Sequence, residues 1–188
     1  MQLTSMAQAW LSAHIQAGDT VIDATLGNGF DALYLAQSIG KTGTLYGFDV
    51  QQEAIHSTTQ RLQDEPCEQV FFLHGHEHMM AHIPQDKHGH IQAIMFNLGW
   101  LPNSDKSVIT HADTTILALK QSLQLLAPSG RISIMLYPGH HGGDLEAAQV
   151  TDWLQTKHLH DISFKLEQIR VPQRPKAPIL LQIQKENI

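Results

Sequence analysis

Residues 20–31 have the sequence TVIDATLGNGFD, in which a short apolar run leads directly into two glycines and an acid. The first six residues have the composition of a buried strand, and the apolar spacing from Phe30 to Ile39 predicts a helix. Gly27 and Gly29 lie at the junction, where glycine allows backbone angles and close approaches that a Cβ would block. The stretch therefore predicts a strand, a glycine turn and a helix, the first unit of an α/β fold.

The alternation of strand and helix continues along the chain. Helices are predicted at 3–17, 30–39, 51–63, 112–126 and 144–157, and strands at 20–25, 44–48, 70–73, 92–96, 131–137, 162–169 and 179–183. Such alternation requires crossover connections and gives a parallel sheet, whereas the last two strands, joined by a Pro-rich bend, favour an antiparallel edge hairpin. The prediction is one domain, residues 1–188, with a Rossmann-like, doubly wound, mostly parallel seven-stranded sheet and helices on both faces.

Composition narrows the classes of function. The 188 residues are 42% hydrophobic and 16% charged, which is typical of a folded globular chain. A formal net charge of −6 excludes an electropositive coat for bulk nucleic-acid binding. Cys67 is the single cysteine, which excludes a disulfide framework and a Cys-based zinc site. The sequence has neither a signal peptide nor an apolar run of roughly 18 residues, so we expect a cytoplasmic protein with no membrane partner.

A carboxylate follows the second strand at the distance typical of nucleoside-binding folds. Asp49 lies 20 residues after Gly29, where it can accept hydrogen bonds from both ribose hydroxyls of an adenosine or, more simply, cap the next helix. Residues 27–32, GNGFDA, match G-x-G-x-x-A, so NAD is a candidate, while the lack of G-K-[ST] excludes a P-loop. Acids beside the turn instead favour the cationic S-adenosyl-L-methionine over a pyrophosphate. The predicted cofactor residues are Asp23, Gly27, Gly29, Asp31 and Asp49.

The segment after the fourth strand, residues 97–102 (NLGWLP), would face the reactive end of that cofactor. The side-chain carbonyl of Asn97 can accept a hydrogen bond from an amine, and Trp100 can stack on a flat base. Tyr137 and His140 follow the fifth strand at the same edge. We predict that these four residues form the catalytic side of the pocket; the alternative is an Asn turn with Trp100 packed in the core.

These motifs resemble the small methyltransferase family labelled rRNA methylases, whose better-understood members methylate a wobble uridine of tRNA. The matching stretches, in order along nearly the whole chain, are DATLGNGFD (23–31), FDVQQEAI (48–55), HEHM (76–79), FNLGWLPNSDK (96–106), TTILAL (114–119), YPGHHGGDLE (137–146) and APILLQIQK (177–185). The resemblance implies a cytoplasmic, homodimeric tRNA 5-(aminomethyl)-2-thiouridine methyltransferase that uses S-adenosyl-L-methionine.

The resemblance also implies residue roles. The residues that would contact the cofactor are Asn28, Asp31, Asp49, Gln51, Gly75 and His76. The chain departs from the family pattern at Ala32, where Thr is usual, at Gly75, where Ser is usual, and at Pro172, where Asn is usual. The last departure would affect how the tail contacts the substrate.

Histidines at 74, 76 and 78 would share one face of a strand, a spacing that can bind zinc. Because the third strand should end near His74, we expect these side chains to be solvated or to face the cofactor, and we predict no metal site. Four cations at the tail, Lys165, Arg170, Arg174 and Lys176, either contact RNA phosphates or form a solvated hairpin edge.

The sequence therefore predicts methyl transfer from S-adenosyl-L-methionine to an exocyclic amine of a modified tRNA wobble uridine. The alternatives are a methyltransferase acting on rRNA or another substrate, an NAD(P)-dependent oxidoreductase, and a nucleoside- or RNA-binding module without chemistry.

Overall fold

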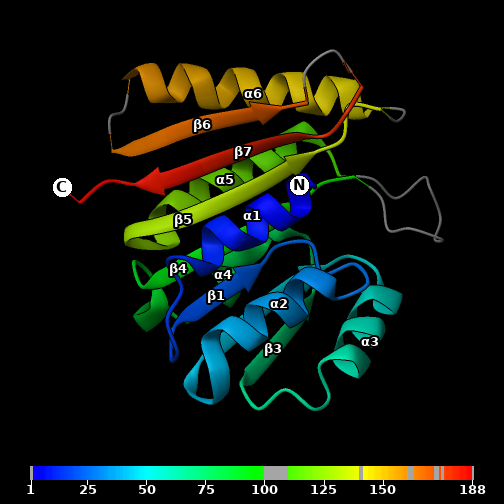
Figure 1. Cartoon of the computed structure of the whole chain (residues 1–188), viewed down its shortest axis with the longest axis vertical. Coiled ribbons are helices and arrows are strands. Elements are labelled where there is room, and N and C mark those ends of the chain that lie inside the picture. The colour runs from blue at the N-terminus through cyan, green and yellow to red at the C-terminus, as the bar shows by residue number, and fades with distance from the viewer. Residues whose placement is uncertain are drawn as a thin grey trace.

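The computed structural model describes residues 2–99, 110–139, 142–160, 163–171, 174 and 176–187. Within these residues a single sheet has the strand order β3-β2-β1-β4-β5-β7-β6. The strands are β1 (Thr20–Asp23), β2 (Thr44–Asp49), β3 (Glu68–Leu73), β4 (Ile91–Asn97), β5 (Leu126–Leu136), β6 (Phe164–Arg170) and β7 (Ile179–Lys185). The first five pair in parallel, and β7 pairs antiparallel with β5 and β6. The predicted doubly wound sheet with its antiparallel edge hairpin is confirmed (Figure 1).

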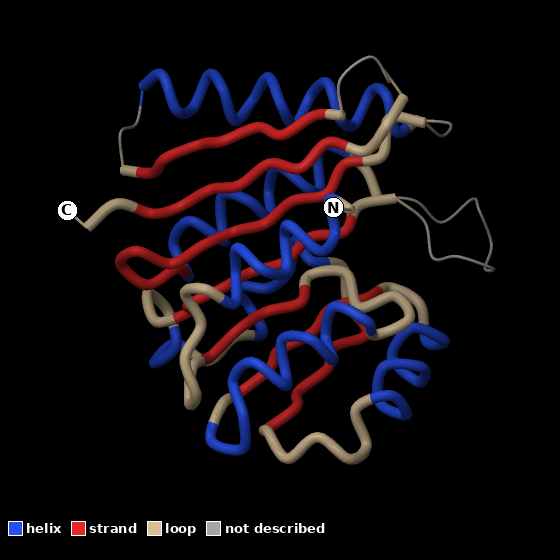
Figure 2. Tube along the Cα trace, in the orientation of Figure 1, coloured by secondary structure: helices blue, strands red, loops and turns tan. Residues whose placement is uncertain are grey.

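Helices cover both faces of the sheet (Figure 2). The helices on one face are α1 (Leu3–Ser12), α2 (Phe30–Ile39) and α3 (Gln52–Arg61). Those on the other face are α4 (Met79–His82), α5 (Ala112–Leu125) and α6 (Gly143–His160). Short 3-10 helices lie at Gly40–Thr42, His76–His78 and Gln85–Lys87. None of the helices in the described part of the chain is long and apolar enough to cross a bilayer.

The core is divided between the two faces of the sheet. Successive strand residues point to opposite sides, so Val21 packs with residues of α1 and α2, whereas its neighbour Ile22 packs with residues of α5 and α6. Both side chains are fully buried. Because the central strands are covered on both sides, most of their residues are apolar, and the carboxyl ends of β1, β2 and β4 carry the polar residues Asp23, Asp49 and Asn97, where the candidate site forms.

The two largest differences from the predicted element boundaries are in β5 and α1. Strand β5 begins at Leu126 rather than at residue 131, because Leu126 pairs with Ile91 of β4, and pairing resumes at Arg131 after the turn-like residues 127–130, APSG. A register shift between Ile91 and Ala93 accommodates the extra residues. Helix α1 ends at Ser12 rather than at residue 17, and the backbone then turns with two amides bonded to the carbonyl of Leu11.

Candidate active site

A cavity of about 490 Å³ lies at the carboxyl ends of β1, β2 and β4, the edge at which doubly wound sheets bind ligands. Its walls come from the loops after these strands, from the turn after β3, from Tyr137 after β5 and from the start of α5. The predicted site residues that line it are Gly27, Asn28, Asp31, Asp49, Gln51, Gly75, His76, Asn97 and Tyr137. Asp23 and Gly29 are absent from its described lining, and Trp100 and His140 lie outside the described residues.

The glycine turn after β1 packs against α3. Gly29 has a positive φ of 76°, and a Cβ there would lie 2.9 Å from the Cα of Thr58. Any other residue would meet both backbone strain and a steric clash at this position. Gly29 therefore lets the turn approach α3 closely, and the lining residues on either side of it, Asn28 and Phe30, reach the pocket.

Asp49 at the end of β2 is fixed by the backbone. Its Oδ2 accepts a hydrogen bond from the amide of Gly27 at 3.0 Å, and its Oδ1 accepts one from the amide of Gln51 at 2.9 Å. Burial raises the pKa of this carboxyl, and these amides oppose the rise. A carboxylate has about four acceptor sites, so each oxygen of Asp49 can accept a further hydrogen bond from a ligand in the pocket.

His76 lines the same cavity. Its Nδ1 lies 3.3 Å from the carbonyl oxygen of Ala24, a contact that requires the proton on Nδ1 and leaves Nε2 as an acceptor. Nε2 is buried and has no hydrogen-bond partner among the described residues. Burial lowers the pKa of His76, which keeps the imidazole neutral near pH 7. An orphaned neutral acceptor in a pocket is suited to an exocyclic amine such as that of adenine.

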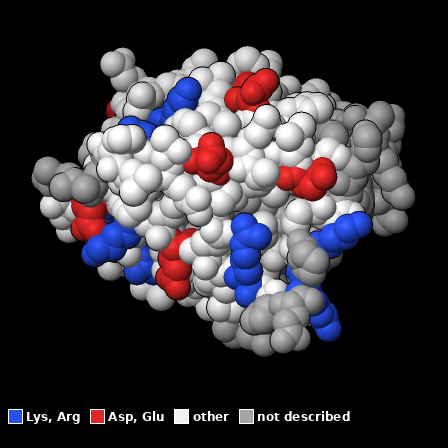
Figure 3. All heavy atoms as spheres, turned by 90° about the horizontal axis from the view of Figure 1, so that it is seen from above, with Lys and Arg blue, Asp and Glu red and all other residues white. Residues whose placement is uncertain are grey.

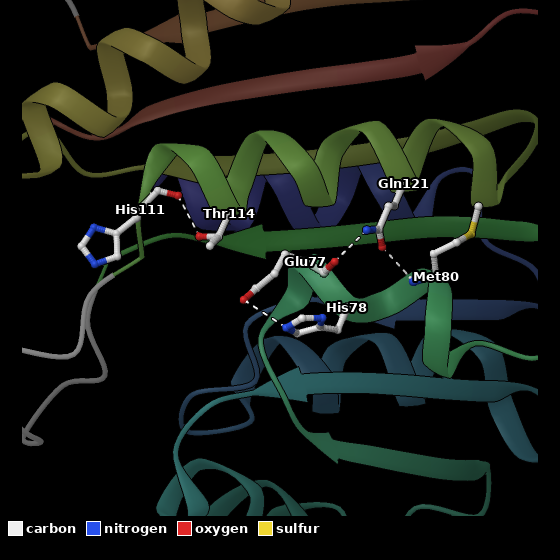
Figure 4. Close-up of polar contacts among 6 residues, drawn as sticks. All are labelled: Glu77, His78, Met80, His111, Thr114 and Gln121. Atoms are coloured by element: carbon white, nitrogen blue, oxygen red, sulfur yellow. Dashed lines mark hydrogen bonds and ion pairs between the residues drawn. The ribbon is translucent and has the colours of Figure 1, made fainter.

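The turn that carries His76 is tied to α5 by one amide side chain. Gln121 donates to the carbonyl of Glu77 at 2.6 Å and accepts from the amide of Met80 at 2.8 Å (Figure 4). Both bonds join residues more than 40 positions apart in the sequence. The position of His76 therefore depends on α5, whose first turn also lines the pocket.

Asn97 ends β4, and its amide group is oriented by Asp31. Asn97 Nδ2 donates to Asp31 Oδ2 at 3.1 Å, and Gln8 of α1 donates to the other oxygen, Oδ1, at 2.9 Å. The Asn97 carbonyl remains an acceptor at the pocket. Tyr137 forms a side-chain hydrogen bond with Asn97. Burial, and to a smaller extent the charge of Asp31, raises the pKa of the Tyr137 phenol. Tyr137 therefore remains protonated at neutral pH.

Each backbone amide of residues 97–99 donates a hydrogen bond to another part of the chain. The amide of Asn97 donates to Thr25 Oγ1 at 2.7 Å, and the amide of Leu98 donates to the carbonyl of Met135 at 2.9 Å. The amide of Gly99 donates to Thr110 Oγ1 at 3.0 Å. Gly99 has a φ of 143°, which favours glycine. Three different segments of the chain thus fix three consecutive residues at the pocket.

Asp23 lies behind the pocket. It is 1% exposed, and its Oδ1 accepts from the amide of Thr25 at 3.1 Å, while its Oδ2 is buried without a partner among the described residues. Burial, and secondarily the nearby charge of Asp31, raises the pKa of Asp23 well above its ordinary value. Asp23 therefore contacts the backbone of Thr25, which lines the pocket. A direct contact between Asp23 and a ligand remains a prediction.

The other histidines of this region point elsewhere. Strand β3 ends at Leu73, so the strand-like alternation of residues 74, 76 and 78 does not apply. His74 and His78 are exposed, and His74 stacks on His82 with ring centroids 4.4 Å apart. Within the part of the chain that the structure describes, no group of three or more His, Cys, Asp or Glu side chains could hold a metal ion.

Several residues that build the site carry no signal in the sequence. Gln8, Thr25, Thr110, Gln121 and Glu146 belong to no recognisable motif of their own, and each acts on a residue distant along the chain. Two of them fell within stretches matched to the family pattern, Thr25 in residues 23–31 and Glu146 at the end of residues 137–146. No feature of a single sequence would have singled out the other three.

The chemistry of the cavity discriminates between cofactors. Among its described lining residues there is no Lys or Arg, and the charged groups include the carboxylates of Asp31 and Asp49. A pyrophosphate would find no cation there, whereas an adenosine bearing ammonium and sulfonium groups meets carboxylates, a neutral His acceptor and apolar walls such as Phe48 and Leu98. The residues present therefore fit S-adenosyl-L-methionine.

Comparison with known proteins agrees with this chemistry. The chain is 36% identical over 198 residues to a chloroplastic tRNA (mnm(5)s(2)U34)-methyltransferase of Arabidopsis thaliana, covering 95% of this chain and 67% of that protein. A Clostridium thermocellum structure described as a "putative rRNA-methylase" has 34% identity and a TM-score of 0.89, and covers 97% of this chain and 96% of that one. A Streptococcus mutans structure described as a "putative methyltransferase" in complex with SAH has 30% identity and a TM-score of 0.84, with 98% of both chains covered.

The model of one protein family, described as "Putative rRNA methylase", matches residues 45–185. This range includes Asp49, His76, Asn97 and Tyr137, all of which line the cavity. The chain therefore belongs to this family and is an S-adenosyl-L-methionine-dependent methyltransferase.

Proposed function

We propose that this enzyme methylates an exocyclic amine of a modified wobble uridine, 5-aminomethyl-2-thiouridine, in tRNA. The observation that carries the proposal is Asn97, whose amide group is oriented by Asp31 so that its carbonyl can accept a hydrogen bond from an amine at the pocket. The name of the Arabidopsis relative supports this substrate class. The chain spans about two thirds of that relative's length.

The proposed cofactor contacts divide along the cavity. Bound S-adenosyl-L-methionine supplies a methyl group that its sulfonium already activates. Asp49 accepts hydrogen bonds from ribose hydroxyls, and His76 Nε2 accepts one from the adenine amine. Gly27, Asn28, Gln51 and Gly75 complete the walls around the nucleoside. Because no further activation is required, the protein's contribution is the alignment of the attacking group.

On the substrate side, the Asn97 carbonyl accepts an N–H of the neutral amine and directs its lone pair toward the methyl group. Asp31 and Gln8 keep the Asn97 amide in that orientation, and the Tyr137 phenol borders the same space. No strong base is needed, since the amine proton can leave to water after transfer. Stacking of the base on Trp100, and a contact with His140, remain predictions from the sequence.

RNA docking does not require a uniformly basic surface. On the face viewed over α6 and β6, Lys and Arg side chains alternate with Asp and Glu on a mostly uncharged background (Figure 3). One cation of the tail, Lys165, pairs with Glu186 at 3.0 Å. Phosphate contacts by Arg170, Arg174 and Lys176 therefore remain a prediction, and Pro172 lies outside the described residues.

A second candidate substrate is rRNA, because the family description names it. The same site chemistry would serve an exocyclic amine there. The remaining expectations are also proposals: one methyltransferase domain over residues 1–188, a cytoplasmic location and a homodimer.

Nucleoside mass spectrometry tests the substrate. In a strain lacking the gene, total tRNA should contain 5-aminomethyl-2-thiouridine in place of its methylated form. The wild-type gene should restore the methylated nucleoside, and the Asn97→Ala gene should not. A strain with unchanged tRNA nucleosides and a missing methyl group in rRNA would replace the tRNA proposal with the rRNA candidate.

A further inference from the structure

Glu146 is a buried acid that lies outside the cavity. It is 3% exposed, sits in the first turns of α6, and is absent from the described pocket lining. Its carboxylate accepts two hydroxyl hydrogen bonds, from Thr110 to Oε2 at 2.8 Å and from Thr115 to Oε1 at 2.9 Å. Both donors lie at the beginning of α5 or just before it, so Glu146 joins α6 to the segment that enters α5.

Thr110 links Glu146 to Gly99, which lines the pocket. Its Oγ1 donates to Glu146 and accepts from the amide of Gly99 at 3.0 Å, while its own amide donates to the carbonyl of Gly99 at 3.1 Å. A hydroxyl has one O–H to donate and lone pairs that accept, so the direction in which the O–H points decides where the lone pairs lie. The Glu146 carboxylate therefore determines the orientation of the Thr110 hydroxyl and leaves its lone pair facing Gly99.

Gly99 is the last of the three backbone-fixed residues that follow β4. The amides of Asn97 and Leu98 are held by Thr25 and by β5, so the Glu146–Thr110 link supplies the third anchor. Without it, Gly99, whose φ is 143°, could relax and allow the turn to rotate. The side chain of Asn97 would then lose its alignment while the adenosine side of the pocket stayed intact.

We propose that Glu146 is a positioning residue, which acts through Thr110 to hold the Asn97–Gly99 turn in its reactive geometry. The inference rests on the proposed function insofar as Asn97 aligns the attacking amine. Its mechanical part, the fixation of Gly99, is independent of the substrate and can be measured separately.

Four variants test the link. Glu146→Ala removes the carboxylate, and Thr110→Val removes the hydroxyl with little change in shape. Thr110→Ser keeps the hydroxyl and should behave like the wild type. Thr151→Val is a matched control on α6, because the buried Thr151 hydroxyl has no partner among the described residues. If Glu146→Ala does not fold, Thr110→Val and Thr110→Ser still decide the question.

Two readouts are needed. Hydrogen exchange at the amides of Gly99 and Thr110 should accelerate by roughly tenfold or more in Glu146→Ala and Thr110→Val, and stay unchanged in Thr110→Ser and Thr151→Val. Methyl transfer should show a turnover number about tenfold lower in the first two variants, with the dissociation constant for S-adenosyl-L-methionine within about twofold of wild type. Thr110→Ser should recover the turnover.

Unchanged exchange at Gly99 in Thr110→Val, or an equal effect of Thr151→Val on turnover, would overturn the positioning role. A wild-type enzyme that methylates no wobble uridine would refute the proposed function instead. The exchange measurement would still decide whether Glu146 fixes Gly99.

Discussion

Asn97 and Asp31, 66 residues apart in the sequence, are joined by a hydrogen bond of 3.1 Å from Asn97 Nδ2 to Asp31 Oδ2. Gln8 occupies the other oxygen of Asp31, so the carboxylate accepts one amide on each side. Asp31 was predicted as a cofactor residue from its place beside the glycine turn. The geometry adds a second task for it, the orientation of the side chain proposed to align the amine.

Asn97→Ala should lower the turnover number by on the order of 100-fold, the scale of one lost reaction-aligning interaction. Affinity for S-adenosyl-L-methionine should stay within about threefold, because Asp49 ends another strand and His76 lies in the turn after β3. Single-turnover kinetics and calorimetry measure the two quantities. Near-normal single-turnover rates combined with lost cofactor binding would make Asn97 a cofactor-side residue and would refute its proposed role.

Asp31→Ala frees the Asn97 amide to rotate, so the turnover number should fall at least about tenfold. The double variant Asp31→Ala/Asn97→Ala should lose little more than Asn97→Ala alone, since residues that act through one contact are not additive. Kinetics of the two single variants and the double variant make the comparison. Fully additive losses would show that Asp31 acts independently of Asn97.

The local elements of the site could be predicted from the sequence, because they depend on neighbouring residues. The glycine turn, Asp49 at the end of β2 and Asn97 at the end of β4 each follow an apolar strand. The common edge of a parallel sheet then brings their side chains to one pocket. Even the inward turn of His76 agrees with a third strand that ends before it.

The long-range contacts could not be predicted, because they depend on how helices pack across the sheet. Gln8 contacts Asp31 because α1 lies beside α2. Gln121 contacts Glu77 because α5 packs on the 3-10 helix His76–His78. The early start of β5 was missed for a different reason. Pro128 and Gly130 are typical turn residues and do lie in a bulge, but Leu126 already pairs with Ile91 of β4 before that bulge.

Asp49→Ala should weaken S-adenosyl-L-methionine binding by roughly 1.5–3 kcal/mol, the usual contribution of hydrogen bonds to a charged group. The variant also leaves the amides of Gly27 and Gln51 without their acceptor, so its melting temperature serves as the control for folding. Titration calorimetry with S-adenosyl-L-methionine and with NAD gives the two affinities. Binding of NAD as tightly as S-adenosyl-L-methionine would contradict the assigned cofactor chemistry.

His76 should make the stability of the fold depend on pH. Burial lowers its pKa below the ordinary value of 6.5, so between the two values the unfolded chain binds a proton that the folded chain does not. The stability due to neutral His76 is present above about pH 6.5 and is lost as the pH falls toward the folded-state pKa. His76→Asn cannot titrate but can still donate to Ala24.

The free energy of unfolding of the wild type should therefore decrease relative to His76→Asn as the pH falls from about 7 to about 5. Chemical denaturation at matched pH values measures the difference, and the other twelve histidines cancel because both proteins contain them. Parallel curves for the two proteins would mean that His76 is not buried in its neutral form.

Methyl transfer in vitro tests the central claim most directly. Purified enzyme, S-adenosyl-L-methionine with an isotopically labelled methyl group, and separate tRNA and rRNA from the strain lacking the gene are the only components needed. We predict label in tRNA alone, recovered after digestion as the methylated amine of 5-aminomethyl-2-thiouridine, and none with Asn97→Ala. Label in rRNA with tRNA left unlabelled would contradict the account. Label on a ring carbon or on a ribose oxygen in place of the amine would contradict it as well.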